Sequence, residues 1–100
     1  MFIAMNRFKI VKGMEGDFIE IWKKRESYLD EVPGFMEFHL LQGQTFEDYT
    51  LFASHSVWES AKSFEDWTRS EAFRRAHAGA GSTRNVYMGP PNLELFEAVI

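Results

Sequence analysis

Two kinds of hydrophobic periodicity alternate along this chain, and their order restricts the folds that it can adopt. Strands are expected over residues 2–11, 35–43, 49–57 and 93–100. Helices are expected over residues 17–30, 60–67 and 70–78. The short connection over 44–48 makes the two central strands a hairpin. Because the last two helical pieces adjoin, the predicted order is β-α-β-β-α-β.

This order is that of the ferredoxin-like split β-α-β fold, in the α+β class. A four-stranded antiparallel sheet would carry both helices on one face. One hundred residues suit one such domain, and we expect it to span residues 1–100. The other face would expose Ile3, Met5 and further apolar strand residues. A second copy would cover them, so we predict a homodimer whose sheets face each other as an α+β barrel.

The first strand carries one polar side chain in an otherwise apolar row. The period of two places Phe2, Ala4, Asn6, Phe8 and Ile10 on one face. A buried amide must find hydrogen bonds or lose about 1–3 kcal/mol. Asn6 is therefore either a structural plug or a hydrogen-bond donor aimed at a ligand.

The second half of the chain places an aromatic residue and a histidine on one helix face. The T-x-x-E spacing of Thr68 and Glu71 predicts that a helix begins there. On this helix Phe73 and His77 lie four residues apart and share a face. Small residues follow at 78–81 and leave open space beside the imidazole. We therefore expect this segment to form the wall of a pocket between the helices and the sheet.

Further side chains on the predicted helices have two interpretations each. Arg25 follows Trp22 by three residues in the same apolar stripe. Its guanidinium either snorkels from the edge of the core or pairs with a ligand carboxylate. Trp67 either fills the core or takes part in a site. The irregular stretch 79–92 is rich in Gly, Ser, Pro and Asn, and its length is typical of a functional loop.

Composition argues against several classes of function. The net charge is −4 without a basic stripe, which disfavours a nucleic-acid partner. The absence of cysteine excludes disulfides, thiolate metal sites, C-x-x-C-H haem attachment and a thiol nucleophile. His39 and His55 lie in strands without an H-x-H or H-x-x-E pair, so we interpret them as surface or internally satisfied residues. No apolar run reaches the ~20 residues of a membrane helix, and the first residues do not form a signal peptide, so we expect a cytoplasmic protein without a membrane partner.

Several short motifs are spread over nearly the whole chain. They are Asn6 in AMNRF, W-E-S at 58–60, F-E-D-W at 64–67 and F-R-R-A-H at 73–77, together with K-G at 12–13 and P-G-F at 33–35. An asparagine, a tryptophan and a histidine in this order and at these spacings resemble the IsdG-type haem-degrading monooxygenases. Those proteins belong to the antibiotic biosynthesis monooxygenase superfamily of dimeric ferredoxin-like proteins.

The resemblance implies that the chain binds haem as both substrate and cofactor. His77 would be the axial ligand of the haem iron, and Asn6 would donate a hydrogen bond on the distal side. Trp67 would press on the distal face of the porphyrin and help distort the ring. The remaining haem contacts would come from Trp22, Arg25 and Phe73. Ring opening would use O2 and an external electron donor, such as a reductase or ascorbate, and would release iron with biliverdin or a related tetrapyrrole.

Two alternatives use the same fold. The first is a cofactor-free monooxygenase of polyaromatic phenols, in which Asn6 and Trp67 hold the substrate and His77 is incidental. The second is a non-enzymatic dimeric barrel that binds and carries haem or another hydrophobic ligand. Activity without added iron or haem would favour the first. Stable haem binding without ring opening would favour the second.

Overall fold

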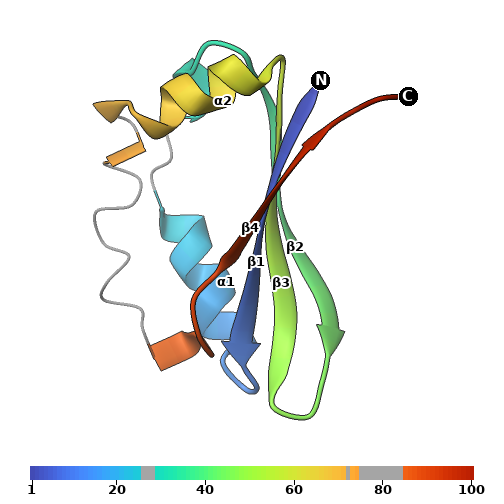
Figure 1. The fold of residues 1–100 in the computed structure, drawn as a ribbon. Coiled ribbons are helices and arrows are strands. Elements are labelled where there is room, and N and C mark those ends of the chain that lie inside the picture. Colours follow the sequence, from blue (N-terminus) through green and yellow to red (C-terminus); the bar gives the residue numbers. More distant parts are fainter. Residues whose placement is uncertain (26–28, 72, 75–84) are drawn as a thin grey trace.

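Four antiparallel strands form a single sheet in the computed structural model, which describes residues 1–25, 29–71, 73–74 and 85–100 (Figure 1). The strands are β1 (Phe2–Val11), β2 (Phe35–Thr45), β3 (Tyr49–Trp58) and β4 (Asn92–Glu97). Their order across the sheet is β2-β3-β1-β4, and every pairing is antiparallel. The two strands adjacent in sequence, β2 and β3, form the predicted hairpin. The predicted ferredoxin-like sheet is confirmed.

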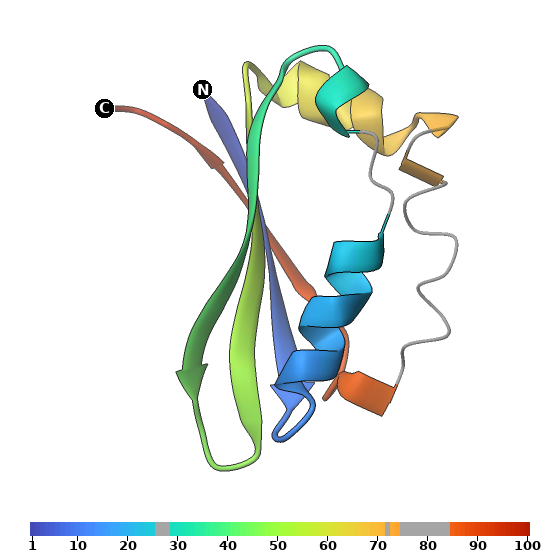
Figure 2. The same cartoon turned by 180° about the vertical axis from the view of Figure 1, so that it is seen from behind.

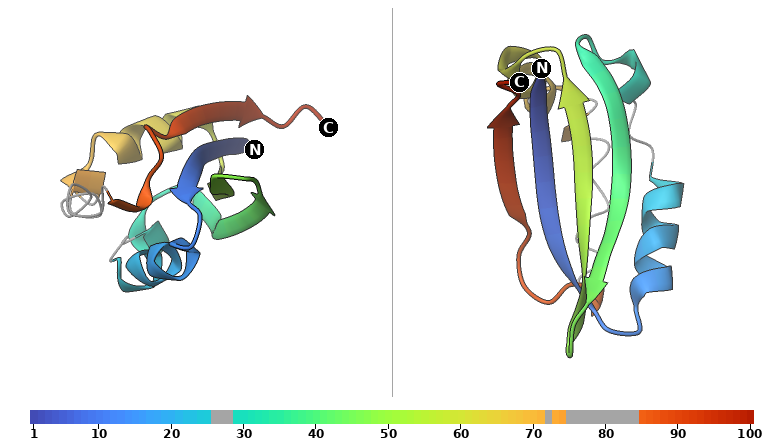
Figure 3. Two further views of the ribbon diagram at one scale, coloured as in Figure 1. Left: turned by 90° about the horizontal axis from the view of Figure 1, so that it is seen from below. Right: turned by 90° about the vertical axis from the view of Figure 1, so that its right-hand side faces the viewer.

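The described helices lie on one face of this sheet. They are α1 (Glu15–Lys24), the short 3-10 helix η1 (Leu29–Glu31) and α2 (Ala61–Thr68). Figure 2 shows α1 and α2 beside opposite ends of the same face. The face seen in the right-hand view of Figure 3 has no described helix in front of it. None of the helices in the described ranges is long and apolar enough to cross a membrane.

The first helix and the last strand are shorter than predicted. The apolar spacing predicts a helix over 17–30, but α1 begins at Glu15 and ends at Lys24. Arg25 takes an extended conformation, with φ −74° and ψ 126°, and this conformation ends the helix. The strand predicted over 93–100 instead spans Asn92–Glu97, where Glu97 pairs with Phe2 at the start of β1. One further backbone hydrogen bond, from the N–H of Ala98 to the carbonyl oxygen of Met1 at 2.9 Å, follows the strand.

The second helical piece begins later than the T-x-x-E spacing predicts. Thr68 is the last residue of α2, and its hydroxyl donates to the carbonyl oxygen of Glu65 at 2.7 Å. Ser70 takes the capping role instead, since its Oγ accepts a hydrogen bond from the backbone N–H of Phe73 at 3.2 Å. The prediction that Ser60 caps α2 is confirmed, because its side chain accepts from the N–H of Ser63.

The core between helices and sheet is divided into two hydrophobic clusters. One consists of Phe2, Ala4, Leu29, Trp58 and Phe64. The other consists of Phe8, Ile10, Phe18, Phe52 and Val86. The apolar row of β1 thus contributes two residues to each cluster, and Asn6 lies between them. The single polar residue of that row marks the point at which the core is interrupted.

The opposite face of the sheet is partly apolar. Ile3 and Met5 on β1 are half-buried, while Phe96 on β4 and Leu41 on β2 are 47% and 42% exposed. Their places in the strand register put all four on the side away from the helices. No described segment of the chain covers this face (Figure 3).

Candidate functional site

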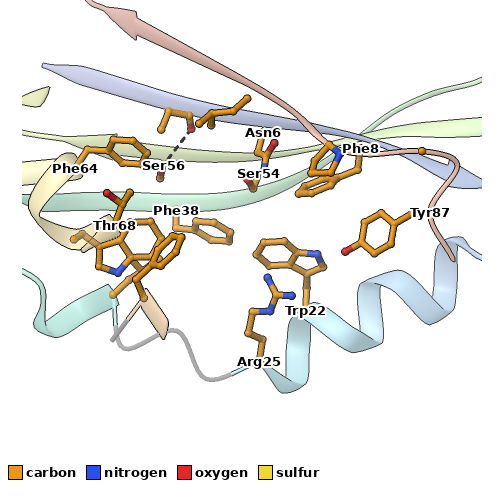
Figure 4. Close-up of a pocket in the computed structure, with 17 residues that line it drawn as sticks. Asn6, Phe8, Trp22, Arg25, Phe38, Ser54, Ser56, Phe64, Thr68 and Tyr87 are labelled. Atoms are coloured by element: carbon orange, nitrogen blue, oxygen red, sulfur yellow. Dashed lines mark hydrogen bonds between the residues drawn. The ribbon is translucent and has the colours of Figure 1, made fainter. Parts of the chain in front are cut away.

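A cavity of about 820 Å3 occupies the gap between the two hydrophobic clusters (Figure 4). The sheet contributes Ala4, Asn6, Phe8, Phe38, Ser54, Ser56 and Leu93 to its lining. The helical side contributes Trp22, Arg25, Leu29, Phe64, Trp67, Thr68 and Phe73, and the segment before β4 contributes Tyr87, Gly89 and Pro91. Sites for small molecules commonly measure about 300–1,000 Å3 and combine apolar walls with a few polar groups. This cavity has both properties.

Asn6 supplies a polar atom to the sheet side of the cavity. Its neighbours in the strand register, Ser54 on β3 and Leu93 on β4, also line the cavity. The side-chain Oδ1 is buried and has no hydrogen-bond partner among the described residues. A structural plug would be expected to satisfy this atom within the protein. The geometry instead leaves the amide available to a bound molecule.

Trp22 and Arg25 form the wall at the end of α1. The indole of Trp22 stacks on Phe38, with ring centroids 5.6 Å apart and planes inclined by 20°. The guanidinium carbon of Arg25 lies 4.3 Å from the centroid of the Trp22 ring, in a cation–π contact (Figure 4). The indole Nε1 is buried and has no hydrogen-bond partner among the described residues. This wall therefore presents both an aromatic surface and an unused donor.

The charge of Arg25 is the main electrostatic feature of the cavity. Burial lowers the pKa of Arg25, whereas the electrostatic influence of Tyr87 raises it. A guanidinium nevertheless stays protonated in proteins. No carboxylate in the described part of the chain pairs with it. Arg25 can therefore receive an anionic group of a ligand.

An aromatic cluster closes the other end of the cavity. The ring of Trp67 lies 5.3 Å from that of the fully buried Trp58 and 4.9 Å from that of Phe73, which meets it edge-on. Trp67 itself is half-buried and borders the cavity. The two interpretations of this tryptophan are thus compatible, because it packs on the core with one part and lines the cavity with another.

The structure brings most of the predicted site residues together. Those that line the cavity are Asn6, Trp22, Arg25, Trp67 and Phe73. His77 and residues 79–84 of the predicted loop lie outside the described residues. The axial-ligand role of His77 therefore stays a prediction.

Sequence reasoning missed Tyr87 and several strand residues of the cavity. Tyr87 forms an isolated β-bridge with Ile10, and the N–H of Met88 donates to the carbonyl oxygen of Lys9 at 2.8 Å. These contacts bring the end of the irregular stretch to the cavity. The stretch has no hydrophobic periodicity from which the contacts could have been predicted. Phe38 and Ser54 could have been found by applying strand alternation outward from Asn6, once the register was known.

The family model for antibiotic biosynthesis monooxygenases matches residues 1–79 of the chain. The chain belongs to this family. It is 33% identical over 81 residues to a heme-degrading monooxygenase of Bacillus cereus, which covers 81% of this chain and 75% of that relative. Membership of the antibiotic biosynthesis monooxygenase family confirms the resemblance read from the motifs and supports a monooxygenase activity.

Solved structures of antibiotic biosynthesis monooxygenases and related proteins share the fold. MhuD, a heme-degrader from Mycobacterium tuberculosis with two hemes bound in its active site, is 26% identical, with a TM-score of 0.75 over 100% of this chain and 97% of that one. A monooxygenase of Streptomyces coelicolor in complex with nanaomycin D is 20% identical, with a TM-score of 0.72 over 99% and 90% of the two chains. At that identity the likeness shows the fold alone.

Proposed function

We propose that this chain is a haem-degrading monooxygenase that binds haem as its substrate in the cavity and opens the porphyrin ring with O2 and external electrons. The observation that carries the proposal is the position of the Asn6 amide. Its Oδ1 atom is buried and has no hydrogen-bond partner among the described residues, and Asn6 lines a cavity with aromatic walls. The heme-degrading relatives support the same substrate class.

The residues of the cavity fit haem in shape and charge. Haem is a flat, largely apolar ring with carboxylates at one edge. Trp22, Phe38 and Trp67 offer aromatic surfaces to the ring. Arg25 offers a cation to a carboxylate, and a guanidinium can pair with both carboxylate oxygens. The cavity volume of about 820 Å3 lies within the range that small-molecule sites use.

Asn6 and His77 have complementary roles in the proposed site. The neutral imidazole of His77 would hold the iron as its axial ligand. The amide of Asn6 would present its NH2 donor on the distal side after rotation about the last side-chain bond. Because an amide does not titrate, this hydrogen bond would persist over a wide pH range.

Trp67 would supply a rigid surface against the porphyrin. Its contacts with Trp58 and Phe73 hold the ring in place, so pressure from a bound porphyrin would not easily displace it. Bound haem supplies the oxygen activation and the redox chemistry of ring opening, as cofactors generally do. We propose biliverdin or a related tetrapyrrole and free iron as products, and a reductase or ascorbate as the electron source.

The experiment is an optical titration of the purified chain with hemin, followed by ascorbate in air. We expect a saturable Soret band that then decays while an iron chelator captures the released metal. A Soret band that persists under ascorbate would indicate a haem carrier. Failure to form a band, together with oxidation of a polyaromatic phenol without haem, would indicate the cofactor-free alternative.

The axial ligand is tested with His77→Ala. We expect this variant to lose the ligand-field spectrum of the wild-type complex and most of its ring-opening activity. Exogenous imidazole should restore the spectrum, since it can occupy the vacated position on the iron. An unchanged spectrum and unchanged ring opening in His77→Ala would reject His77 as the ligand.

A further inference from the structure

The sheet face opposite the cavity carries a cluster of side chains that haem degradation does not use. Phe38 and Ser54 line the cavity, so the residues that follow them point to the other face. These residues are His39 on β2 and His55 on β3, and they stand directly opposite each other in the strand register. Their ring centroids are 6.4 Å apart. Glu37 precedes His39 by two residues and shares its face.

These three side chains converge on one point. One ligand atom each from Glu37, His39 and His55 lies within 4.8 Å of the other two. Glu37 and His39 are exposed, and His55 is half-buried. No side-chain hydrogen bond or ion pair joins any of the three to another described residue. Their donor atoms therefore have no partner within the described part of one chain and are available to an ion. His55 is paired with Met5 in the strand register, so a second copy that covers this face would enclose the ion between the two sheets.

We propose that Glu37, His39 and His55 bind a divalent transition-metal ion, for which Zn2+ is the best match. Two imidazoles and one carboxylate form a donor set that zinc sites in proteins use, with a fourth position left for water or another ligand. Tetrahedral bonds of about 2.0–2.2 Å bring ligand atoms to about 3.3–3.6 Å from one another. Rotation about the side-chain bonds of Glu37 and His39 can supply this contraction.

Sequence spacing does not reveal this site, because the ligands come from two strands. His39 and His55 are not part of an H-x-H pair, so the sequence alone indicates surface or internally satisfied histidines. The hairpin register brings them together. A bound ion would tie the edge strand β2 to β3 on the partly apolar face of the sheet.

The test is calorimetric titration of the chelator-treated full chain with ZnCl2, before any haem is added. We expect saturable binding of one Zn2+ per chain. His39→Ala and His55→Ala should each weaken binding by roughly tenfold or more, because each removes one of three ligands. Glu37→Gln should weaken it as well. Absorption bands of Co2+ in a tetrahedral site of nitrogen and oxygen ligands should appear in the wild type and vanish in His39→Ala.

The third histidine of the chain provides the matched control. His77→Ala should bind Zn2+ as tightly as the wild type, whereas it should lose the axial ligation of hemin. Absence of saturable Zn2+ binding, equal affinity in His39→Ala and the wild type, or weakening only in His77→Ala would each overturn the metal site. Hemin titrations of His39→Ala separate the two proposals, because loss of Zn2+ binding with hemin binding retained places the metal away from the cavity.

Discussion

Asn6 is the residue at which the core of this protein gives way to a cavity. Its neighbours in the apolar row of β1, Ala4 and Phe8, belong to different hydrophobic clusters. The buried Oδ1 has no partner among the described residues, so it opposes folding unless a ligand satisfies it. A measurement of the free energy of unfolding can therefore decide whether Asn6 is a structural plug or a ligand contact.

We expect Asn6→Ala to separate stability from activity. The substitution removes an unsatisfied acceptor, so the free energy of unfolding without ligand should stay within about 1 kcal/mol of the wild type or rise. The rate of ring opening should fall by about 100-fold, as for the loss of one positioned donor. Urea unfolding and single-turnover decay of the Soret band measure the two effects. Destabilisation with unchanged decay would identify a structural plug. Ser54→Ala, at the neighbouring position in the register, controls for a general change in cavity polarity.

The two interpretations of Arg25, packing on Trp22 or pairing with a ligand carboxylate, can be distinguished by comparing hemin with its dimethyl ester. If its guanidinium receives a carboxylate, Arg25→Ala should weaken the binding of hemin by about tenfold, the loss expected for one charge-assisted hydrogen bond. The same variant should bind hemin dimethyl ester as the wild type does. Optical titrations with both ligands measure this difference. Equal weakening for the two ligands would show that Arg25 acts by packing on Trp22.

At the scale of elements, α1 is joined to the sheet by a hydrogen bond near its first turn. The hydroxyl of the fully buried Thr50 donates to Glu15 Oε2 at 2.6 Å, and the N–H of Gly13 donates to Oε1 at 2.9 Å. The bond from Thr50 is the largest cause that lowers the pKa of Glu15 below its ordinary value of 4.5. A carboxylate with a lowered folded-state pKa stabilises the fold above its ordinary pKa and loses that effect as the pH falls through the folded value.

Glu15→Gln should therefore lower the melting temperature at neutral pH, and the difference from the wild type should shrink below about pH 4.5. Thermal unfolding from neutral pH to about pH 3 measures this convergence. Glu20→Gln is the matched control, since Glu20 is an exposed carboxylate of the same helix. A Glu15→Gln difference that does not change with pH would show that the hydrogen bond contributes without its charge.

The start of β2 depends on a glycine. Gly34 has φ +84°, and a Cβ at this position would meet the side chain of Ser63 on α2. We expect Gly34→Ala to cost about 1–2 kcal/mol from the left-handed conformation alone, with a further cost from the contact with Ser63. Gly16→Ala in α1 is the control, because its Cβ would meet nothing within 4 Å and should be neutral or stabilising. Urea unfolding of both variants tests the contrast, and an equal effect would contradict it.

Element order was more predictable than element boundaries. Periodicity reports which face is buried, and the alternation around Asn6 was correct along all of β1. Periodicity does not show at which residue a helix ends and another backbone conformation begins. The apolar stripe predicted for the first helix continues to Leu29, yet Leu29 is buried from η1 after the backbone extends at Arg25. The helical piece after α2 begins later than predicted because Thr68 and Ser70 are both residue types that can cap the start of a helix, and Ser70 takes this role.

At the scale of the whole molecule, the two faces of the sheet have different surroundings. The helix-facing side holds the cavity, whereas the other side exposes apolar residues that no described segment covers. We propose that a second copy of the chain covers this face, as in the predicted α+β barrel. Large exposed apolar side chains that gather on one face commonly mark an interaction surface, and most soluble oligomers are symmetric homo-oligomers.

Two neighbouring residues on β4 test this assembly. Phe96 and Leu95 are exposed to similar extents, 47% and 49%, but alternation directs them to opposite faces of the sheet. Phe96→Glu would bury a charge against the partner, so we expect a monomer by sedimentation equilibrium. Leu95→Glu should remain a dimer. The opposite pattern, or no change in either variant, would place the contact elsewhere.

The same pair shows whether the cavity depends on the dimer. Every described residue that lines the cavity belongs to one chain, and Phe96 is not among them. A monomeric Phe96→Glu variant should therefore still form a Soret complex with hemin. Its affinity for hemin should fall only to the extent that loss of the partner's packing destabilises the sheet. Loss of hemin binding in proportion to the loss of dimer would show that the second copy completes the site. Hemin titration across protein concentrations that span the dimer dissociation decides between these outcomes. A site that the second copy completes loses its affinity for hemin as the dimer dissociates, whereas a site within one chain keeps most of that affinity.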